Sequence, residues 1–138
     1  MIQLTDEMKA AFATALTDAS PVLVASAGKL GMPDIAYKGS SMVFDDQHLA
    51  FWERAHGTTL QNISENGQVC LLYRNAATRL SWKFFGVAEL HREGPMRDAI
   101  MSRTIEFELG RDPDRKGVGV LIRVDSVMQA GKEIMRRE

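Results

Sequence analysis

The sequence lacks the features that identify several large classes of protein. It contains one cysteine, Cys70, so no intramolecular disulfide can form and no CxxC metal or redox motif is present. Its longest apolar runs fall far short of the ~20 residues that a membrane-spanning helix needs. With 17 basic and 18 acidic residues, the formal net charge is −1, so no overall field attracts the protein to nucleic acid or anionic lipid. Any anion site must therefore be local.

Motifs of common enzymatic sites are missing as well. Neither GxGxxG nor GxxxxGK[ST] occurs, which excludes the usual dinucleotide and nucleoside-triphosphate cradles. His48, His56 and His91 share no ligand spacing, so we expect no metal site. There is no nucleophile elbow, and Cys70 lies within an apolar stretch, where a buried and inert thiol is expected.

Composition and the N-terminal segment indicate an ordinary cytoplasmic domain. At 138 residues, with 45% hydrophobic and 25% charged residues, the chain fits one domain over residues 1–138 with a proper core. The first residues, Met1 to Glu7, show no basic region followed by an apolar run and therefore no signal peptide. Together with the lone cysteine, this predicts a cytoplasmic location.

The hydrophobic period changes from helical to extended after Pro21. Apolar residues between Met8 and Ala19 recur at helical spacing behind a Thr5 cap, which predicts a first helix. Further helices are expected to start at Thr58, in a capping box with Gln61, and at Pro95, ending at Gly110. Extended segments are expected at residues 22–26, 34–44, 48–53, 69–73, 80–90 and 117–128.

These elements predict a mainly β (α+β) fold. Strands and helices do not alternate regularly, so parallel βαβ units are not expected. Six to seven strands with about three peripheral helices fit a closed or nearly closed antiparallel barrel. Residues 69–73 have almost no polar interruption and are expected to be buried on both faces, Gly86 is expected to kink its strand, and the charged tail from Gly131 is expected to fray.

One segment, Arg54 to Thr59, has the composition of a phosphate site. A helix N-terminus offers unpaired N–H groups and about half a positive charge, which suit a dianion. The hydroxyls of Thr58 and Thr59 and the guanidinium of Arg54 would add hydrogen bonds, with His56 beside them. The same residues also fit an ordinary capped helix beside a solvated arginine, so the pattern alone leaves both interpretations open.

A second segment, one hairpin upstream, suits a planar ring. A cation, a position without Cβ and two hydroxyls follow one another as Lys38, Gly39, Ser40 and Ser41. A planar, hydrogen-bonding ring needs close backbone approach, donors to its carbonyls and a cation near its electron-rich edge. Trp52 and Trp82 could supply flat apolar walls, although barrel core or dimer contact is an equal explanation for such aromatic residues.

The stretch from Phe51 to Leu72 resembles the phosphate-loop region of the pyridoxamine-phosphate-oxidase-like flavoproteins. In both, a strand is followed by a loop with basic and hydroxyl residues, a short helix, an Asn-rich turn and a buried strand. Residues 36–41 are similar to the strand that lines the flavin ring in that family, and the order of elements matches from about Pro21 to Leu90. The resemblance implies a split antiparallel β-barrel with FMN bound between the two subunits of a homodimer.

The resemblance also implies roles for individual residues. The segment from Lys38 would line the ring, the loop and helix start would hold the phosphate, and one strand would reach the flavin of the other subunit. The implied cofactor-binding residues are Lys38, Gly39, Ser40, Ser41, Trp52, Arg54, His56, Thr58, Thr59, Trp82 and Lys83. Family members often carry a basic pair where this chain has two threonines. In this chain the phosphate would therefore be bound mainly by Arg54, His56 and the helix end.

The leading hypothesis is an FMN-dependent oxidoreductase that acts on a small molecule. Pyridoxamine phosphate is not the expected substrate, because the chain ends at Glu138 without the family's C-terminal substrate segment. Alternatives are a non-catalytic flavin carrier or sensor, a deazaflavin binder, or a haem-handling protein with His56 or His91 as axial ligand. Tyr37, His56 and Lys83 are unranked candidates for an acid or base.

Overall fold

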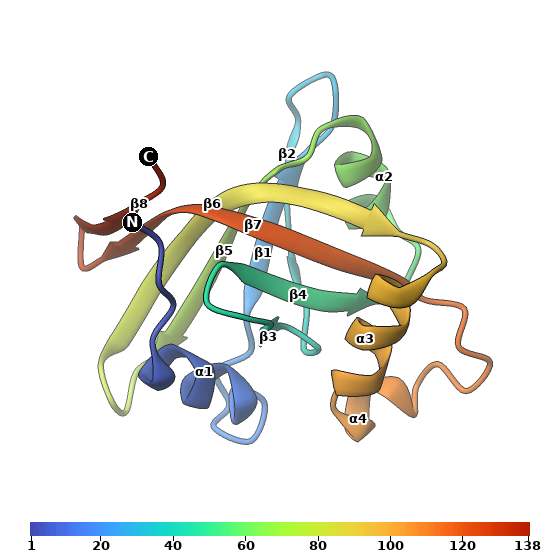
Figure 1. Cartoon of the computed structure of the whole chain (residues 1–138), viewed down its shortest axis with the longest axis horizontal. Helices are drawn as coiled ribbons and strands as arrows, with labels where there is room; N and C mark the ends of the chain where they lie inside the picture. The colour runs from blue at the N-terminus through green and yellow to red at the C-terminus, as the bar shows by residue number, and fades with distance from the viewer.

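The computed structural model describes residues 1–138 and consists of a curled antiparallel sheet with helices at its edges (Figure 1). The strand order is β2-β1-β5-β6-β7-β4-β3, with β8 paired to β7. This confirms the predicted mainly β split barrel; the chain has eight strands and four helices, where six to seven strands and about three helices were expected. The elements are α1 (Asp6–Ala13), β1 (Leu23–Ala27), β2 (Pro33–Tyr37), β3 (Met42–Val43), β4 (His48–Glu53), α2 (Thr58–Glu65), β5 (Gln68–Asn75), β6 (Leu80–His91), α3 (Pro95–Arg103), α4 (Glu106–Leu109), β7 (Val118–Gln129) and β8 (Lys132–Arg136).

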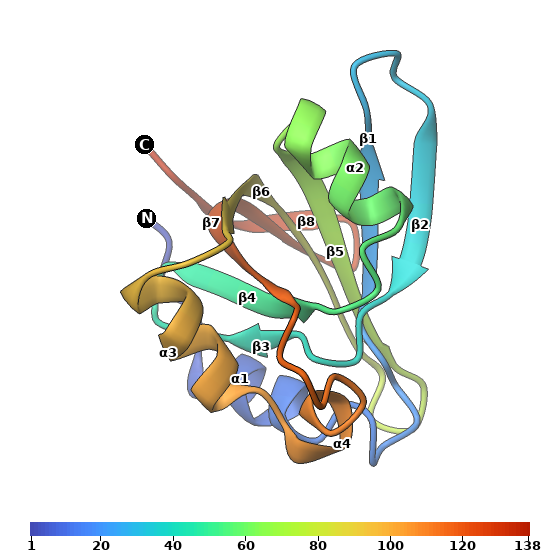
Figure 2. The same cartoon turned by 90° about the vertical axis from the view of Figure 1, so that its right-hand side faces the viewer.

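The helices lie in two places around the sheet. Figure 2 shows α1, α3 and α4 beside β3 and β4, and α2 at the opposite end near β1 and β2. None of the four helices has the length and apolar character that a membrane-crossing helix requires.

The sheet encloses an aromatic core because alternate residues of its strands point inward. Leu71, Tyr73, Trp82 and Phe84 are all at most 1% exposed. Phe12 of α1 joins them, stacking on Tyr73 at 5.7 Å between ring centroids and meeting Phe84 edge-on at 5.4 Å. Such pairs contribute about 0.5–1.5 kcal/mol beyond the buried area. The first helix therefore closes one side of the barrel.

Strand β4 separates this core from a second, smaller one. Its inner face contributes Leu49 and Phe51 to the barrel, whereas Ala50 and Trp52 on its other face pack with Ile100 of α3. A strand buried on both faces is fixed in register by both sets of contacts. The end of β4 is consequently a rigid base for the loop that follows it.

Several local predictions are confirmed. The side chain of Thr5 accepts a hydrogen bond from the Met8 amide and caps α1. The register of β6 and β7 shifts between Phe85 and Gly86, where a Cβ would lie 2.2 Å from the Arg123 carbonyl oxygen. Helix α3 starts at Pro95 as expected.

Other local predictions are wrong. The capping box does not form, because Thr58 is the first residue of α2 and Gln61 bonds instead to Glu65. The segment expected to be buried on both faces follows one-sided alternation, and Cys70 and Leu72 are only partly buried on the outer face. The third helix is interrupted at Thr104 and Ile105, which are extended, so α4 is separate.

The tail does not fray as predicted but forms strand β8 against β7. Ala130 and Gly131 both adopt positive φ, at 50° and 79°, which is the conformation of a tight type I′ hairpin turn. The N-terminal ammonium donates to the carbonyl of Arg136, so both chain ends are held at the same edge.

We expect Phe84→Ala to lower the free energy of unfolding by about 3–5 kcal/mol, because it empties the centre of the aromatic core. Urea denaturation of the purified protein measures this change. Phe107→Ala is the matched control, since Phe107 is 65% exposed on α4 and its removal leaves no cavity. Equal losses for the two variants would contradict the core that we describe.

Candidate functional site

The chain reverses direction immediately after β4. His56 adopts a left-handed φ of 53°, and Gly57 then occupies the N-cap position of α2. Two contacts hold the reversal: the His56 amide donates to Glu53 Oε2 at 3.0 Å, and the His56 ring Nε2 lies 2.8 Å from the Lys116 carbonyl oxygen. The loop after β4 is therefore fixed from two sides.

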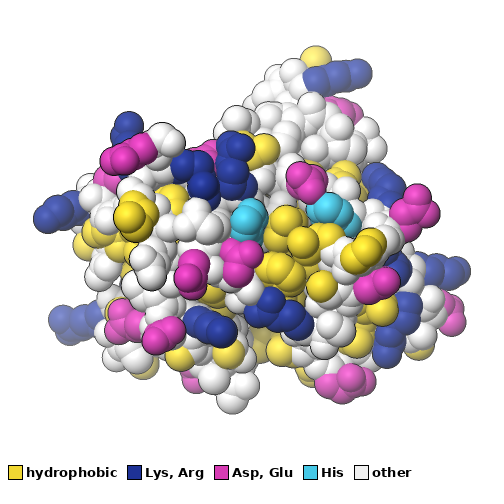
Figure 3. Space-filling model, viewed as in Figure 1, with side chains coloured by type: hydrophobic (Ala, Val, Ile, Leu, Met, Phe, Trp, Pro, Cys, Tyr) yellow, Lys and Arg dark blue, Asp and Glu magenta, His cyan; other side chains and the backbone are white.

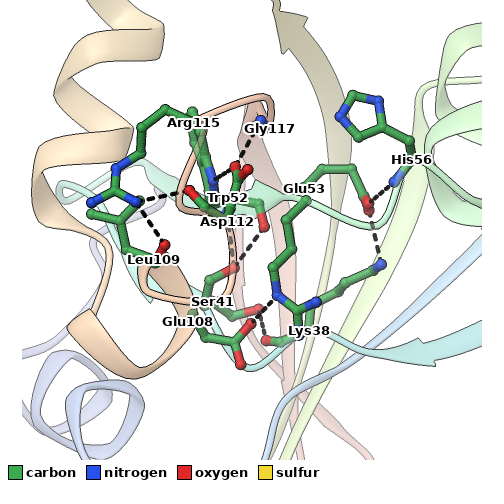
Figure 4. A network of polar contacts seen from close by, with 12 residues as sticks. Lys38, Ser41, Trp52, Glu53, His56, Glu108, Leu109, Asp112, Arg115 and Gly117 are labelled. Carbon is green, nitrogen blue, oxygen red and sulfur yellow. Dashed lines mark hydrogen bonds and ion pairs between the residues drawn. The ribbon is translucent and has the colours of Figure 1, made fainter.

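Glu53 is also half of a buried ion pair (Figure 4). Its Oε1 lies 2.8 Å from Nζ of Lys38, and the two side chains are 0% and 13% exposed. Oε1 accepts no hydrogen bond beyond this ionic contact. A carboxylate so deeply buried requires a compensating charge, so the pair ties the turn after β2 to the end of β4.

Arg54 makes a looser ion pair with α4. Its Nε lies 3.3 Å from Glu108 Oε1, and 28% of the arginine side chain is exposed. Gly39 allows this approach, since a Cβ there would lie 2.9 Å from Glu108 Oε2. Gly39, which the sequence analysis expected to leave room for a ring, thus leaves room for the carboxylate of Glu108.

The two serines predicted at the ring bond to the backbone. Ser40 Oγ donates to the Trp52 carbonyl oxygen at 3.0 Å and accepts from the Trp52 amide at 2.9 Å. Ser41 Oγ donates to the Lys38 carbonyl oxygen at 2.7 Å. Both residues are buried; the Ser40 hydroxyl fastens the segment between β2 and β3 to β4, and the Ser41 hydroxyl closes the turn within that segment.

Trp52 is the centre of a further polar network on the outer side of β4. Its Nε1 donates to Asp112 Oδ2 at 2.9 Å, and the Arg97 guanidinium lies 4.8 Å from its ring centroid. Gly117 packs directly on the ring, where a Cβ would be 2.4 Å from it. With 2% exposure, the Trp52 side chain offers little surface to a ligand.

Asp112 organises the loop between α4 and β7. Its carboxylate also accepts from the Lys116 amide at 2.9 Å and from the Gly117 amide at 2.8 Å. Burial raises the pKa of Asp112, but these hydrogen bonds, with that from Trp52 and the nearby charge of Arg115, outweigh burial and keep its pKa below the usual 3.8.

The remaining predicted residues fall into two groups. At the start of α2 no side chain caps the helix, Thr58 is exposed and Thr59 is buried, so the first N–H groups of the helix are available to an anion. Trp82 lies in the aromatic core at 1% exposure, whereas Lys83 is exposed on the outer sheet face.

The structure thus brings part of the predicted set together. Lys38, Ser40, Trp52 and Arg54 line one small pocket of about 70 Å³, with Tyr37, Ala55 and Glu108. Lys83 lies in the same cross-strand row as Tyr37 but three strands away, roughly 14 Å at the usual strand spacing.

Sequence reasoning missed the acidic partners of this region. Glu53, Glu108 and Asp112 are buried and each binds a residue of the predicted set, but they stand in the sequence among other charged residues. Only Glu53 carried a signal, because it ends a strand that is otherwise apolar.

The family model described as pyridoxamine 5'-phosphate oxidase matches residues 8–125. Among curated proteins, none matches the chain.

Solved structures share the fold over most of their length. HupZ of Group A Streptococcus is 27% identical, with 98% of this chain and 99% of that chain covered and a TM-score of 0.75. An FMN-binding protein from Syntrophomonas wolfei is 12% identical, with 90% and 84% covered and a TM-score of 0.70. An F420 reductase is 13% identical, with 79% and 89% covered and a TM-score of 0.62. At 12% and 13% identity, the last two show the fold alone.

We expect Asp112→Asn to destabilise the protein by about 1–3 kcal/mol at pH 7, because its amide would leave one buried N–H donor unpaired. The folded-state pKa of Asp112 is lowered, so its contribution is present above about pH 3.8 and is lost as the pH falls below that value. Urea denaturation at pH 7 and at pH 3 should therefore show a difference from wild type that shrinks in acid. Asp114→Asn, at an exposed site in the same loop, is the control; a pH-independent difference for Asp112→Asn would refute this role.

Proposed function

Because the chain belongs to the pyridoxamine 5'-phosphate oxidase family, we propose that it is a homodimeric FMN-binding oxidoreductase that acts on a small molecule. The observation that carries this proposal is the meeting of two cations and a helix start at the end of β4. Glu53 joins Lys38 to the loop before α2 through its contacts with Lys38 and the His56 amide. Arg54, in this loop, lines the same pocket as Lys38. The FMN-binding protein of Syntrophomonas wolfei has the same fold.

The donor set at this point suits a phosphate group. The first N–H groups of α2 have no capping side chain, Thr58 adds an exposed hydroxyl, and Arg54 is partly exposed. Lys38 and Glu53 form the tighter and more deeply buried pair at 2.8 Å, whereas Arg54 and Glu108 are 3.3 Å apart. We therefore assign the phosphate to Arg54, Thr58 and the helix start, with Glu108 giving up its arginine when the phosphate binds.

The chain's own residues would bind and orient the cofactor. Bound FMN supplies the redox chemistry, which no amino-acid side chain provides. The Lys38 ammonium group is held beside the pocket by Glu53 Oε1 at 2.8 Å. The network around Asp112 fixes Trp52 and hence the strand from which the loop emerges.

We propose the outer face of β2, β1, β5 and β6 as the dimer interface. Ile35, Ala25, Cys70 and Phe85 are register partners in one continuous row across these strands. Ile35 is 63% and Phe85 39% exposed, and the neighbouring Tyr37 is 69% exposed. A contiguous exposed apolar surface such as this one is typical of a protein–protein contact. Lys83, at the edge of this surface, would then lie near the cofactor of the partner subunit.

A flavin carrier or sensor is the second candidate. Lys38, Arg54 and Glu108, which line the pocket, are all paired with an opposite charge, so Tyr37 is the one lining side chain left as a candidate acid or base. Stopped-flow reduction of the flavin-loaded protein by NADH or NADPH, followed by reoxidation with quinone acceptors, distinguishes the two. Rapid turnover supports the oxidoreductase, and reduction no faster than that of free FMN supports the carrier.

A haem-handling role has less support. The His56 ring nitrogen contacts the Lys116 carbonyl oxygen, and His91 Nε2, which makes no hydrogen bond, is buried 2.6 Å from Glu89 Oε1, so neither ring nitrogen is open to an axial position. The visible spectrum of the purified protein, alone and after addition of FMN or haemin, tests all of these ligands in one measurement.

We expect Arg54→Ala to weaken FMN binding by roughly 1.5–3 kcal/mol, the usual contribution of a charge-assisted hydrogen bond. Glu108→Gln should have the opposite sign or no effect, because it frees Arg54 for the phosphate. Quenching of flavin fluorescence on titration gives both affinities, with riboflavin as the phosphate-free ligand. Unchanged FMN affinity in Arg54→Ala, or equal losses for FMN and riboflavin, would remove Arg54 from the phosphate site.

We expect the wild-type protein to sediment as a dimer at micromolar concentration and Phe85→Glu to sediment as a monomer. The substitution places a charge at the middle of the proposed interface, where it would be desolvated. Leu30→Glu is the control, since Leu30 is 91% exposed at the tip of the β1–β2 hairpin. A monomeric wild type, or a dimeric Phe85→Glu variant, contradicts the interface.

A further inference from the structure

A groove runs between α1 and α4 on the side of the sheet that carries β3. Its inner part is a pocket of about 180 Å³, lined along α1 by Lys9, Phe12 and Ala13 and closed by Ile105 before α4. It continues into a wider and shallower part of about 490 Å³, whose lining is almost entirely apolar. The residues common to both parts are Ala13, Leu16 and Ile105.

Both walls of the groove carry apolar side chains, and its charged side chains are confined to the inner part. On the α1 side, residues 9, 12, 13 and 16 recur at helical spacing and present one face to it. On the α4 side, Ile105 and Phe107 are 38% and 65% exposed, although both are large apolar side chains. Its floor is the segment from Gly39 to Val43, which ends in β3, the edge strand of the sheet.

The inner end of the groove carries two cations and no carboxylate. Lys9 forms no ion pair or hydrogen bond through its ammonium group, and no acidic side chain lines either part. Arg103 is held in place by the carbonyl oxygen of Phe44 at 2.6 Å and by stacking over the Phe44 ring at 4.4 Å, neither of which neutralises its charge. Glu108, the nearest carboxylate on α4, faces Arg54 across Gly39.

We propose that this groove binds a small organic anion with an elongated apolar body, its carboxylate at Arg103 and Lys9 and its apolar part along Leu16, Ile105 and Phe107. The size of the groove is that of small-molecule sites, which are apolar concavities with a few polar groups that fix orientation. The charge asymmetry favours an anion, because the two exposed cations attract a carboxylate and repel a cationic ligand, and no acidic side chain in the lining opposes this. The groove shares Ser40 with the pocket proposed for the flavin, but neither its two cations nor its large apolar side chains line that pocket, so the proposal does not rest on flavin binding.

Ile105 offers a matched pair of variants for testing the site. It lines both parts of the groove and is also the N-cap residue of α4, with extended backbone at φ −62° and ψ 143°. Asp and Asn are both favoured at an N-cap, so Ile105→Asp and Ile105→Asn should fold alike. They differ by one negative charge inside the groove, whereas both remove the same apolar side chain.

The probe is sodium decanoate below its micellar concentration, titrated into the full chain by calorimetry, with decanol and decyltrimethylammonium as ligands of other charge. We expect saturable binding of one decanoate per chain, and binding of the other two at least about tenfold weaker. Arg103→Gln should weaken decanoate about tenfold or more, as loss of a charge-assisted contact does. Ile105→Asp should weaken it by about a further tenfold relative to Ile105→Asn, and Arg92→Gln, at an exposed position on the turn before α3, should leave it unchanged.

Three results would overturn the proposal. Decanoate that fails to bind wild-type protein removes the site. Equal binding of decanoate and decanol, or equal affinity in Ile105→Asp and Ile105→Asn, removes the anion recognition. If decanoate does not bind and sedimentation shows that Ile105→Asp alone abolishes self-association, the groove is covered by a second copy of the chain instead.

Discussion

The carboxylate of Glu53 is buried completely at the end of β4, where it could not persist as a charge without partners. The chain provides two, the ammonium group of Lys38 and the amide of His56. The amide reaches the carboxylate only because His56 takes a left-handed conformation, and this reversal directs the chain into α2. One buried charge therefore determines where the helix start and Arg54 stand relative to the strand.

A second buried carboxylate, that of Asp112, likewise holds Trp52, the residue before Glu53, through hydrogen bonds. Asp112 gathers two amides of its own loop and the indole N–H of Trp52, so the loop before β7 is fastened to β4 beside Glu53. The His56 ring then joins the two loops through the Lys116 carbonyl oxygen. Because these contacts are internal, the loop geometry is formed without a ligand, and little ordering entropy would be lost when one binds.

Features with a local cause could be predicted from the sequence, and features with a distant cause could not. The Thr5 cap, the Gly86 irregularity and the start of α3 at Pro95 each follow from the residue itself and its neighbours in the chain. Strand β8 forms only because β7 offers an edge, which composition cannot reveal for a charged tail. The overall split barrel was predictable because the order of strands and turns is a property of the whole pattern.

In the candidate site, too, the residues themselves could be predicted from the sequence, but their contacts could not. Lys38, Ser40 and Arg54 do meet in one pocket, but their partners come from segments up to 54 positions away. The two tryptophans illustrate the difficulty, since a flat ring at a strand position fits a ligand wall and a packed core equally well. Only the fold shows that Trp52 and Trp82 are 2% and 1% exposed.

The nature of the donors explains how a phosphate could bind where the sequence resemblance led us to expect a basic pair. At the start of α2 the donors are backbone N–H groups, and Thr58 contributes a hydroxyl without charge. Such donors depend on the position of the helix end and hardly on side-chain identity. Glu53 and Lys38 hold the end of β4 and the loop that leads to this helix end, and in the proposed site the charge would be set separately by Arg54 and Glu108. In the proposed site, geometry and net charge would thus depend on different residues, so either could change while the other is kept.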